Sequence, residues 1–283
     1  MPSSVAVVTD STAYLDRKEA ARHGVVVIPL QVVAGGRTMD DVVLGGDELA
    51  ARLREWSPIT TSRPSPERFL HAYREAADRG AAAVVSIHLS AELSGTVDSA
   101  RLAAADAPIP VEVVDSRSLG MGLGFPVLAA AEAAAHGATL AEAADAARRC
   151  MTGLHCYFYV DTLEYLRRGG RIGAAAGLVG SALAIKPLLH IADGAIAPLE
   201  KVRTATRAIA RLEDLAVQAA ADRPVDVAVH HLAALPRAES LAERLSHRIP
   251  CLNRLLITEV GLVIAAHTGP GMLGVTVAPS PTA

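Results

Sequence analysis

Val5-Ala6-Val7-Val8 is followed directly by the polar residues Thr9-Asp10-Ser11-Thr12. Three further runs rich in β-branched residues occur in the first half of the chain, at Val25–Ile28, Ala83–Ile87 and Val111–Val114. Stretches with a helical pattern lie between or after them, at Ala13–His23, Gly46–Arg54, Pro66–Arg79, Gly95–Ala105 and Phe125–His136. Short buried strands that alternate with helices are typical of βαβ units. This half therefore predicts a parallel sheet with helices on both faces.

The second half of the chain, from about Gly153, predicts a mixed sheet. Two short strands, Leu188–Ile191 and Ile196–Leu199, are expected to pair as a hairpin because Ala192-Asp193-Gly194-Ala195 between them is a turn signal. Further elements are expected at Tyr157–Val160, Lys201–Ala221, Val225–His230, Arg237–Arg248, Leu255–Ile257 and Val275–Val277. We predict an α/β protein with two domains, a parallel-sheet domain at residues 1–152 and a smaller mixed-sheet domain at residues 153–283.

Composition excludes several classes of protein. Of the 283 residues, 51% are hydrophobic and 20% are charged, which is too apolar for a disordered chain. Only 3% are aromatic and the formal net charge is -3, so neither base stacking nor a basic surface favours nucleic-acid binding. The odd set Cys150, Cys156 and Cys251 fits reduced thiols better than a disulfide framework. Without a signal-peptide pattern or an apolar stretch of ~18 residues, we expect a cytoplasmic protein with no membrane segment.

Polar residues gather where the predicted parallel strands end. Thr9-Asp10-Ser11-Thr12 follows the first strand, His88-Leu89-Ser90 the third and Asp115-Ser116-Arg117-Ser118 the fourth. Parallel strands place their carboxyl ends at one edge of the sheet, where α/β proteins bind ligands. The same residue types are also ordinary helix N-caps, so either a binding site or simple capping explains them.

Three further segments indicate an anion site. Thr60-Thr61-Ser62-Arg63-Pro64-Ser65-Pro66 is a rigid turn rich in hydroxyls. Leu93-Ser94-Gly95-Thr96 precedes a predicted helix, whose free N–H groups suit a carboxylate or a phosphate. His267 stands before the turn Gly269-Pro270-Gly271, where its imidazole can donate a hydrogen bond to an anion. A glycine cap that binds nothing and a histidine satisfied by local backbone remain open alternatives.

Basic residues concentrate in one segment. Between Arg167 and Arg211 there are eight basic and two acidic residues, a local net charge of +6. Arg207 and Arg211 share a helical face, which Arg203 continues if the helix begins early. The segment is either a solvated face or a docking surface for phosphate or an acidic partner. Within it, the small residues of Gly173–Ala184 suit either the wall of an apolar slot or a packed core helix.

Familiar catalytic motifs are missing. The chain has no Gly-x-x-x-x-Gly-Lys-[Ser/Thr] phosphate loop, and Gly120–Gly124 lacks the third glycine of a dinucleotide fingerprint. The cysteines and histidines do not have the spacing of a zinc site, so we expect neither a metal nor a cofactor. A triad of Ser94, His267 and Asp10 or Asp115 is conceivable, although no Gly-x-Ser-x-Gly elbow supports it.

Taken in order, these segments resemble the signatures of the DegV family. The matching motifs are Thr9-Asp10-Ser11-Thr12, Thr61-Ser62-Arg63-Pro64-Ser65-Pro66, Leu93-Ser94-Gly95-Thr96, Asp115-Ser116, Asp161–Ile172, Lys186-Pro187, Lys201-Val202-Arg203 and His267–Gly271. The resemblance implies a two-domain α/β protein that binds one long-chain fatty acid between its domains. Members are similar to the fatty-acid-binding subunit of bacterial fatty acid kinase, which performs no chemistry alone and presents the carboxylate to a separate ATP-binding kinase subunit.

The resemblance also implies the residues of the site. A fatty carboxylate is expected to meet the hydroxyls of Thr61 and Ser94 and the amide of Gly95, with Ser62 and His267 as further contacts. An alternative function is a hydrolase or phosphotransferase that uses Ser94 and His267 at the same anion site.

Two arginines and two departures complete the comparison with the family pattern. Arg171 and Arg203 match arginines near the mouth of the pocket, which are implicated in partner docking or acyl-phosphate handling. Arg63 stands where the family often has glutamine, and Val97-Asp98 where an aromatic residue and glutamine are frequent. Both departures are expected to alter the rim of the pocket without removing a ligand contact.

Overall fold

The computed structural model describes residues 5–41, 48, 51, 59–178 and 186–280. The chain divides into two compact units, one made of Met1–Gln31 and Ser62–Thr152 and the other of Val32–Thr61 and Gly153–Ala283. The expected N-terminal domain, residues 1–152, therefore includes a segment that the structure groups with the second unit. The physical reason is that this segment forms a sheet of its own and is hydrogen-bonded to other parts of the second unit, as described below.

The first unit is built on a parallel sheet. Its order is β2-β1-β6-β7, with β1 at Val5–Asp10, β2 at Val25–Ile28, β6 at Ala83–His88 and β7 at Val111–Asp115. All neighbouring strands pair in parallel, as the sequence predicts. The strand order reverses between β1 and β6, and open α/β sheets bind ligands beyond the carboxyl ends of the strands at such a point.

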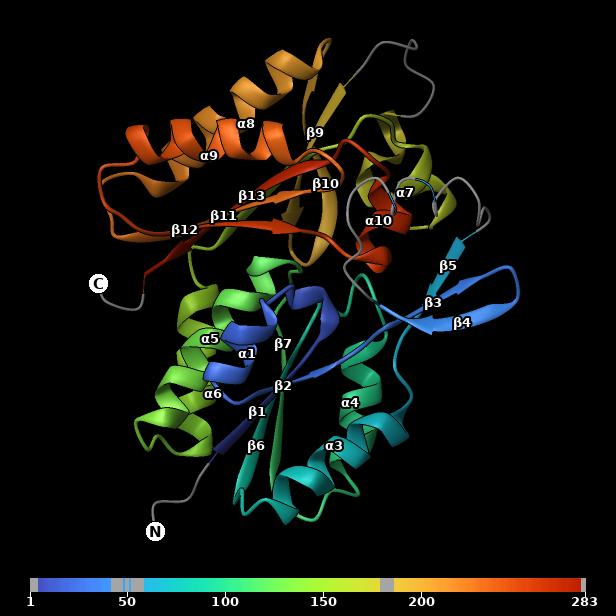
Figure 1. The fold of residues 1–283 in the computed structure, drawn as a ribbon, viewed down its shortest axis with the longest axis vertical. Helices are drawn as coiled ribbons and strands as arrows, with labels where there is room; N and C mark the ends of the chain where they lie inside the picture. The colour runs from blue at the N-terminus through green and yellow to red at the C-terminus, as the bar shows by residue number, and fades with distance from the viewer. Residues whose placement is uncertain (1–4, 42–47, 49–50, 52–58, 179–185, 281–283) are drawn as a thin grey trace. The chain divides into compact units, whose positions relative to one another are not determined.

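Helices cover both faces of this sheet. α3 (Pro66–Asp78) and α4 (Thr96–Ala104) lie on one face, and α5 (Met121–Ala135) and α6 (Leu140–Met151) lie on the other (Figure 1). The short helices η1 (Ser11–Ala13) and α1 (Arg17–Arg22) follow β1. Helix α6 is not among the predicted elements, although Thr139 and Glu142 form the capping box that marks its first turn.

Helix α3 packs on the parallel sheet through an apolar stripe. Phe69, Tyr73 and Ala76 recur at helical spacing and are buried together with Val8 and Val84 of the sheet. Burial of a side chain as large as Phe69 contributes roughly 1.5–3 kcal/mol. The packing of this stripe sets the position of α3 along the sheet. In that position the hydroxyl of Tyr73 lies next to Ser86 of β6.

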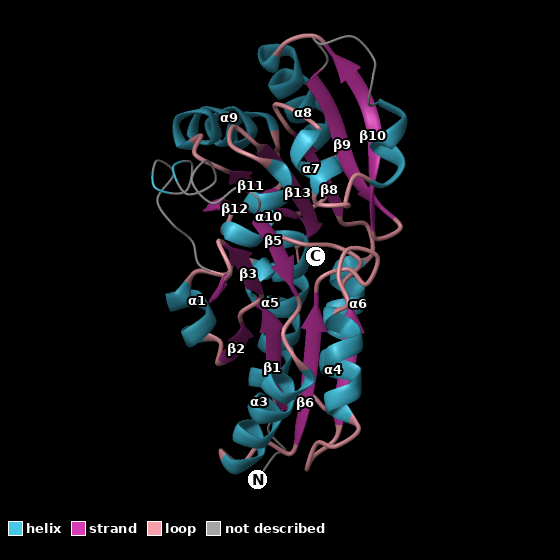
Figure 2. Cartoon of the chain, turned by 90° about the vertical axis from the view of Figure 1, so that its right-hand side faces the viewer, coloured by secondary structure: helices cyan, strands magenta, loops and turns pink. Residues whose placement is uncertain are grey.

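The second unit contains a mixed sheet with the order β10-β9-β8-β13-β11-β12. Its strands are β8 (His155–Tyr159), β9 (Lys186–Ala192), β10 (Ala195–Val202), β11 (Val225–His231), β12 (Leu252–Glu259) and β13 (Leu273–Pro279). Neighbours pair antiparallel except β11 and β12, which are parallel. The predicted hairpin is confirmed, because Ala192 pairs with Ala195 around its turn. Figure 2 shows β9 and β10 as two long adjoining arrows.

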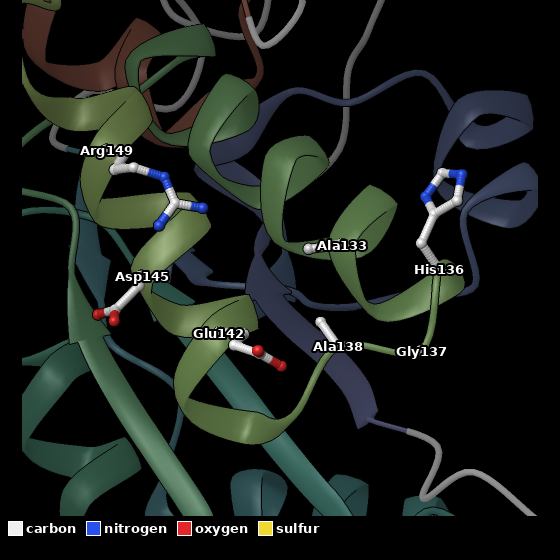
Figure 3. Close-up of a pocket in the computed structure, with 7 residues that line it drawn as sticks. All are labelled: Ala133, His136, Gly137, Ala138, Glu142, Asp145 and Arg149. Atoms are coloured by element: carbon white, nitrogen blue, oxygen red, sulfur yellow. The ribbon is translucent and has the colours of Figure 1, made fainter.

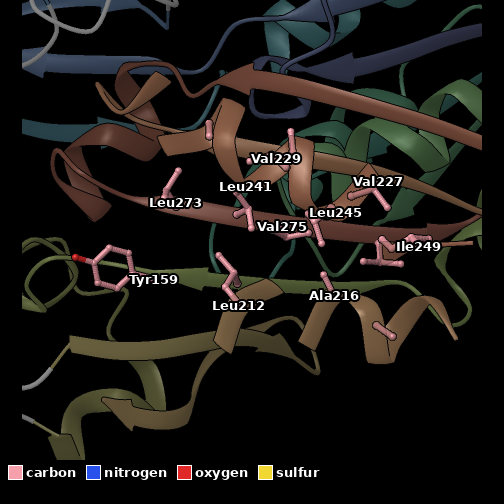
Figure 4. Packing of buried hydrophobic residues seen from close by; sticks show 14 of the residues in the cluster. Tyr159, Leu212, Ala216, Val227, Val229, Leu241, Leu245, Ile249, Leu273 and Val275 are labelled. Atoms are coloured by element: carbon pink, nitrogen blue, oxygen red, sulfur yellow. The ribbon is translucent and has the colours of Figure 1, made fainter. Parts of the chain in front are cut away.

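Two helices cover one face of the mixed sheet. α8 (Ala205–Ala220) and α9 (Leu235–Arg248) bury Leu212 and Leu241 against Val227, Val229 and Val275 (Figure 4). The valines alternate along β11, so Ala228 and His230, which occupy the other alternate positions, face the opposite side of the sheet.

Helix α8 begins later than predicted. Thr204 is its N-cap and its side chain accepts a hydrogen bond from the N–H of Arg207 at 3.3 Å. Lys201 and Val202 belong to the end of β10 instead. The helix does not begin early, so Arg203 lies outside it and does not continue the row of Arg207 and Arg211.

The segment Val32–Thr61 contributes a second sheet. β3 (Gln31–Ala34), β4 (Arg37–Asp40) and β5 (Ile59–Ser62) form it in the order β4-β3-β5. The remaining elements of the second unit are α7 (Glu164–Arg168), η2 (Gly173–Leu178) and α10 (Leu262–Thr268).

Two predicted segments lie mostly or partly outside the described residues, namely the helix at Gly46–Arg54 and the end of Gly173–Ala184. None of the helices in the described ranges combines the length and the apolar character that crossing a bilayer requires.

Candidate functional site

Asp10, the last residue of β1, is a hydrogen-bonding centre at the carboxyl edge of the parallel sheet. Its Oδ1 accepts hydrogen bonds from the backbone N–H and the hydroxyl of Thr12, at 3.0 and 2.5 Å. Its Oδ2 accepts from the N–H of Leu89 at 3.0 Å and lies 3.1 Å from Nδ1 of His88. Asp10 and His88 have no exposed surface. The carboxylate thus holds the segment after β1 against the segment after β6.

His88 extends this network toward α3. Its Nε2 lies 2.7 Å from Oγ of Ser86, and that Oγ lies 2.8 Å from the hydroxyl of Tyr73. Burial raises the pKa of Tyr73 to about 12, so the phenol stays protonated. Ser86, His88 and Asp10 follow the order of a catalytic triad. Ser86 is fully buried and already bonded to Tyr73, however, so we assign the network a structural role.

The predicted anion seat in the first unit lies at the start of α4. Gly95 is the N-cap, and no side chain caps the helix through a hydrogen bond. Oγ of the neighbouring Ser94 lies 2.8 Å from Oγ1 of Thr96. Ser94 and Gly95 are both partly exposed. N–H groups without a side-chain cap and an accessible hydroxyl supply donors for an anion at this position.

Arg63 lies against this seat. A Cβ added at Gly95 would lie only 2.1 Å from Nη1 of Arg63, so the close approach requires glycine. Arg63 is exposed, and within residues 5–41, 59–178 and 186–280 no carboxylate forms an ion pair with it. Arg63, expected at the rim of the pocket, has its guanidinium directly on the backbone of Gly95.

The second unit brings together Thr61 and His267, which are 206 positions apart in the sequence. Oγ1 of Thr61, in β5, lies 2.9 Å from Nε2 of His267, in α10. The other ring nitrogen, Nδ1, is buried and has no hydrogen-bond partner among the described residues. Ser62, the last residue of β5, follows Thr61 directly.

Gly169 makes room for the imidazole of His267. A Cβ added at Gly169 would lie 2.0 Å from Nδ1 of His267, which no real contact allows. The ring therefore rests on the backbone of the turn that follows α7. The sequence analysis included Gly169 in a family motif without assigning it this contact.

His267 is neutral at physiological pH. Burial, with a smaller contribution from the nearby charge of Arg171, lowers the pKa of His267 to about 4. A buried N–H without a partner is rarer than a buried acceptor without one, which favours the tautomer with its proton on Nε2. In that tautomer Nε2–H donates to Oγ1 of Thr61, and the hydroxyl proton of Thr61 is left to donate to a ligand.

A buried carboxylate ties the segment Val32–Thr61 to the helix that carries His267. Oδ1 of Asp41 accepts a hydrogen bond from the N–H of Val263 at 3.0 Å, in the first turn of α10. The helix thus receives an acidic cap from a residue more than two hundred positions away, and this contact holds α10 against the segment that supplies Thr61. Sequence spacing gives no sign of it.

Much of the basic segment is neutralised by acidic residues. Arg167 and Arg168 pair with Glu164, at 2.8 and 2.7 Å. Lys186 pairs with Asp161, which lies before the segment, and Arg211 pairs with Glu200, both at 2.7 Å.

The two arginines assigned to the pocket mouth differ from one another. Nη1 of Arg171 donates to the carbonyl of Gly169 at 2.7 Å, beside the ring of His267. Arg203 is exposed, between β10 and α8.

The first unit also has a shallow polar pocket, which does not coincide with the predicted site. It lies at the turn between α5 and α6 (Figure 3), lined by Ala133, His136, Gly137, Ala138, Glu142, Asp145 and Arg149. α5 begins beside the carboxyl edge of the sheet, where the N–H of Gly120 bonds Thr12, and runs away from it, so this pocket lies at the opposite edge. Across the described ranges no cluster of three or more His, Cys, Asp or Glu side chains is arranged to hold a metal ion.

The fold is similar to that of solved structures whose proteins are reported to bind fatty acids. The chain matches the structure of a DegV family protein from Thermus thermophilus reported for its fatty acid binding, with a TM-score of 0.91 and 34% identity, covering 98% of this chain and 100% of that chain. It matches DegV from Bacillus subtilis, a fatty acid binding protein, with a TM-score of 0.89 and 33% identity, covering 98% and 99% of the two chains.

Sequence comparison leads to the same family. Residues 4–280 match the family model described as "Uncharacterised protein, DegV family". A DegV domain-containing protein from Streptomyces coelicolor is 56% identical over 278 residues, which cover 98% of this chain and 99% of the relative. The chain belongs to the DegV family. Both the expected family and the expected α/β fold are confirmed.

Proposed function

We propose that this protein binds a long-chain fatty acid and holds its carboxylate through hydrogen-bond donors. The observation that carries the proposal is the hydrogen bond between Thr61 and the neutral ring of His267, which leaves the hydroxyl proton of Thr61 to donate to a ligand. The hydroxyl of Ser94 and the N–H of Gly95 supply donors at the start of α4, and Ser62 is adjacent to Thr61. The fatty acid binding of the relatives from Thermus thermophilus and Bacillus subtilis supports this assignment.

The energetics suit an amphipathic ligand. Each buried methylene of an acyl chain contributes about 0.8 kcal/mol, so a long chain supplies on the order of 10 kcal/mol before the costs of association. A few hydrogen bonds to the carboxylate add about 1.5–3 kcal/mol each and set the orientation of the ligand. Affinity thus comes mainly from the chain and selectivity mainly from the head group.

The proposed role is that of a carrier without chemistry of its own. The alternative, a hydrolase or phosphotransferase, requires the imidazole of His267 as a base for Ser94. In the structure Ser94 is hydrogen-bonded to Thr96, and Nε2 of His267 is occupied by Thr61. Both hydroxyl pairings favour ligand binding over nucleophilic attack.

A partner kinase is the second part of the proposal. Among the arginines of the family motifs, the exposed Arg203 is available to a protein partner, whereas Arg171 is folded onto the turn after α7. We place such a pair in the cytoplasm, because an odd set of three cysteines in a chain of this length fits reduced thiols better than a disulfide framework. Arg203→Glu is expected to abolish association with an ATP-dependent fatty acid kinase subunit and to leave palmitate affinity unchanged. Association that survives the charge reversal assigns docking elsewhere.

Ligand binding is tested with purified protein. Native mass spectrometry should show a bound long-chain acid, either co-purified or after incubation with palmitic acid. Thr61→Val and Ser94→Ala should each weaken palmitate binding by about 1–3 kcal/mol. Ser246→Ala, which removes an exposed hydroxyl on α9, is the matched control. No bound acid in the parent protein contradicts the proposal.

A double-mutant cycle tests whether the two donor groups serve one carboxylate. If Thr61 and Ser94 hold the same head group, the combined loss in Thr61→Val/Ser94→Ala differs from the sum of the single losses by about 0.5 kcal/mol or more. Strict additivity contradicts a shared ligand. Turnover of acyl esters by the parent that disappears in Ser94→Ala supports the enzymatic alternative instead.

A further inference from the structure

We propose that Arg63 makes the anion seat at the start of α4 selective for ionised head groups, so that this protein binds fatty acids far more tightly than neutral single-chain lipids such as fatty alcohols. The inference rests on the proposed function and adds to it a specificity-determining residue. The donors already assigned there, the hydroxyl of Ser94 and the N–H of Gly95, carry no charge and can bind a neutral oxygen as well as a carboxylate, so they discriminate less than a guanidinium does.

The side chain of Arg63 packs on the backbone of Gly95. The Cβ that Gly95 lacks would lie 2.1 Å from Nη1, 3.0 Å from Cδ and 3.1 Å from Cζ of Arg63. The whole end of the side chain, and not one nitrogen alone, lies on the backbone of Gly95. Arg63 thus places a guanidinium on the residue whose amide the carboxylate is expected to meet.

The start of α4 has a positive electrostatic potential from two sources. The nine residues of α4 direct their N–H groups and the positive end of the helix dipole toward Gly95. Arg63 adds a full positive charge to the same place. Asp98 is the acidic residue in the first turn of α4, and its Oδ1 lies 3.6 Å from Nη1 of Arg101. This ion pair reduces the negative potential that Asp98 adds at the anion seat. Two positive groups side by side repel one another unless an anion lies between them.

The guanidinium of Arg63 suits a carboxylate better than it suits a neutral head group. Its planar N–H groups match the two oxygens of a carboxylate, and such charge-assisted pairs are roughly twice as strong as neutral hydrogen bonds. A hydroxyl or an ester offers neither the charge nor the paired oxygens. Because Arg63 is exposed in this structure, salt should weaken its contribution.

The test compares a charged and a neutral ligand of equal chain length. Delipidated protein is equilibrated with radiolabelled palmitic acid or 1-hexadecanol at neutral pH, and the bound fraction gives each Kd. Arg63→Gln, which keeps hydrogen-bonding groups but removes the charge, should weaken palmitate binding about tenfold and change hexadecanol binding by less than about twofold. Raising NaCl tenfold should weaken palmitate binding by the parent more than by this variant.

Two controls complete the test. Arg63→Lys keeps the charge and should retain most of the preference for the acid. Arg79→Gln removes a cation at the far end of α3, where Arg79 pairs with Glu75, and should change nothing. Thermal melts establish that each variant is folded.

The two proposals fail in different ways. An unchanged ratio of palmitate to hexadecanol affinity in Arg63→Gln overturns the role of Arg63 and leaves fatty acid binding intact. If the parent binds hexadecanol as tightly as palmitate, Arg63 is likewise not a selectivity residue. If the parent binds neither lipid, the proposed function and this inference both fail.

Discussion

At the scale of single residues, the placement of His267 depends on the missing side chain of Gly169. The imidazole rests on the glycine backbone, and only from that position does Nε2 reach the hydroxyl of Thr61 at 2.9 Å. The hydroxyl that we propose as a ligand donor is therefore positioned by Gly169, which has no side chain of its own to offer a ligand.

Gly169→Ala should uncouple this pair. The added methyl group overlaps the ring, so His267 must move and the hydrogen bond to Thr61 is lost. We expect palmitate affinity to fall by about 1–2 kcal/mol. Gly177→Ala is the matched control, because nothing lies within 4 Å of an added Cβ there. Equilibrium binding of palmitic acid measures both variants, and equal affinity in the two would show that the packing of Gly169 is irrelevant to the site.

The sequence predicts some of the residues that make these contacts, but it does not predict which residues pair with one another. Thr61, Ser94 and His267 were recognisable because hydroxyls and a histidine stood beside glycine and proline turns. The pairing of Thr61 with His267, and that of Asp10 with His88, joins residues 206 and 78 positions apart, which no local pattern encodes. Such pairs follow from topology, which only the structure supplies.

At the scale of elements, one buried polar network joins β1, β6 and α3. It runs from Asp10 through His88 and Ser86 to Tyr73, and none of these residues has exposed surface. Buried polar groups are costly unless every partner is present, so the network specifies how α3 sits on the sheet.

Removing the two ends of the network should have unequal effects. Tyr73→Phe deletes one neutral hydrogen bond and is expected to lower the free energy of unfolding by about 1 kcal/mol. Asp10→Ala leaves His88, Thr12 and the N–H of Leu89 without their acceptor and should cost about 3 kcal/mol or more. Urea unfolding measures both, with Ser246→Ala as a surface control. Similar losses in the two variants would contradict a network centred on the carboxylate.

The elements themselves were largely predictable where one signal dominated. Runs of β-branched residues identified the parallel strands, and Asp193-Gly194 identified the β9–β10 turn. The start of α8 was placed too early because Lys201 and Val202 have no strong preference against a helix, and pairing with Lys186 and Pro187 of β9 decides their conformation instead. Tertiary pairing overrides propensity there.

At the scale of the whole molecule, the buried His230 and the partly buried His267 make stability depend on pH. Burial lowers the pKa of His230 to about 4, where its ring is held between Thr258 and Thr276 at 2.6 and 3.3 Å. His267 has a similar value, with burial as the main cause. Both rings take up a proton on unfolding near pH 6.5 but resist it when folded. Their contribution to stability is therefore intact above about pH 6.5 and is lost as the pH falls toward 4.

The expected loss between pH 7 and pH 5 is about 1–2 kcal/mol for each histidine. Urea unfolding at the two pH values should show it, and His230→Gln should reduce the loss by a similar amount. His71→Gln is the control, because the side chain of His71 is 75% exposed. An identical pH dependence in the parent and His230→Gln would exclude His230 as a source.

The two units also make a prediction about fragments. A fragment of residues 1–152 keeps Val32–Thr61 but lacks the partners of that segment in the second unit, such as the N–H of Val263 and the ring of His267. In amide NMR spectra of the fragment, residues 62–152 should show dispersed resonances and residues 32–61 narrow, unfolded-like ones. Dispersed signals from the whole fragment would mean that the segment folds without the second unit.

The interleaving of the units has a consequence for the order of events on the ribosome. Val32–Thr61 emerges early, whereas the rest of its unit starts at Gly153 and ends with the chain. At a translation rate of roughly 5–20 residues per second, the rest of the unit is synthesised on the order of ten seconds after this segment. During that interval the strand segments β3, β4 and β5 have been synthesised, but the rest of their unit has not. Slower translation of the second half of the chain therefore prolongs the exposure of these segments to proteases and to neighbouring nascent chains.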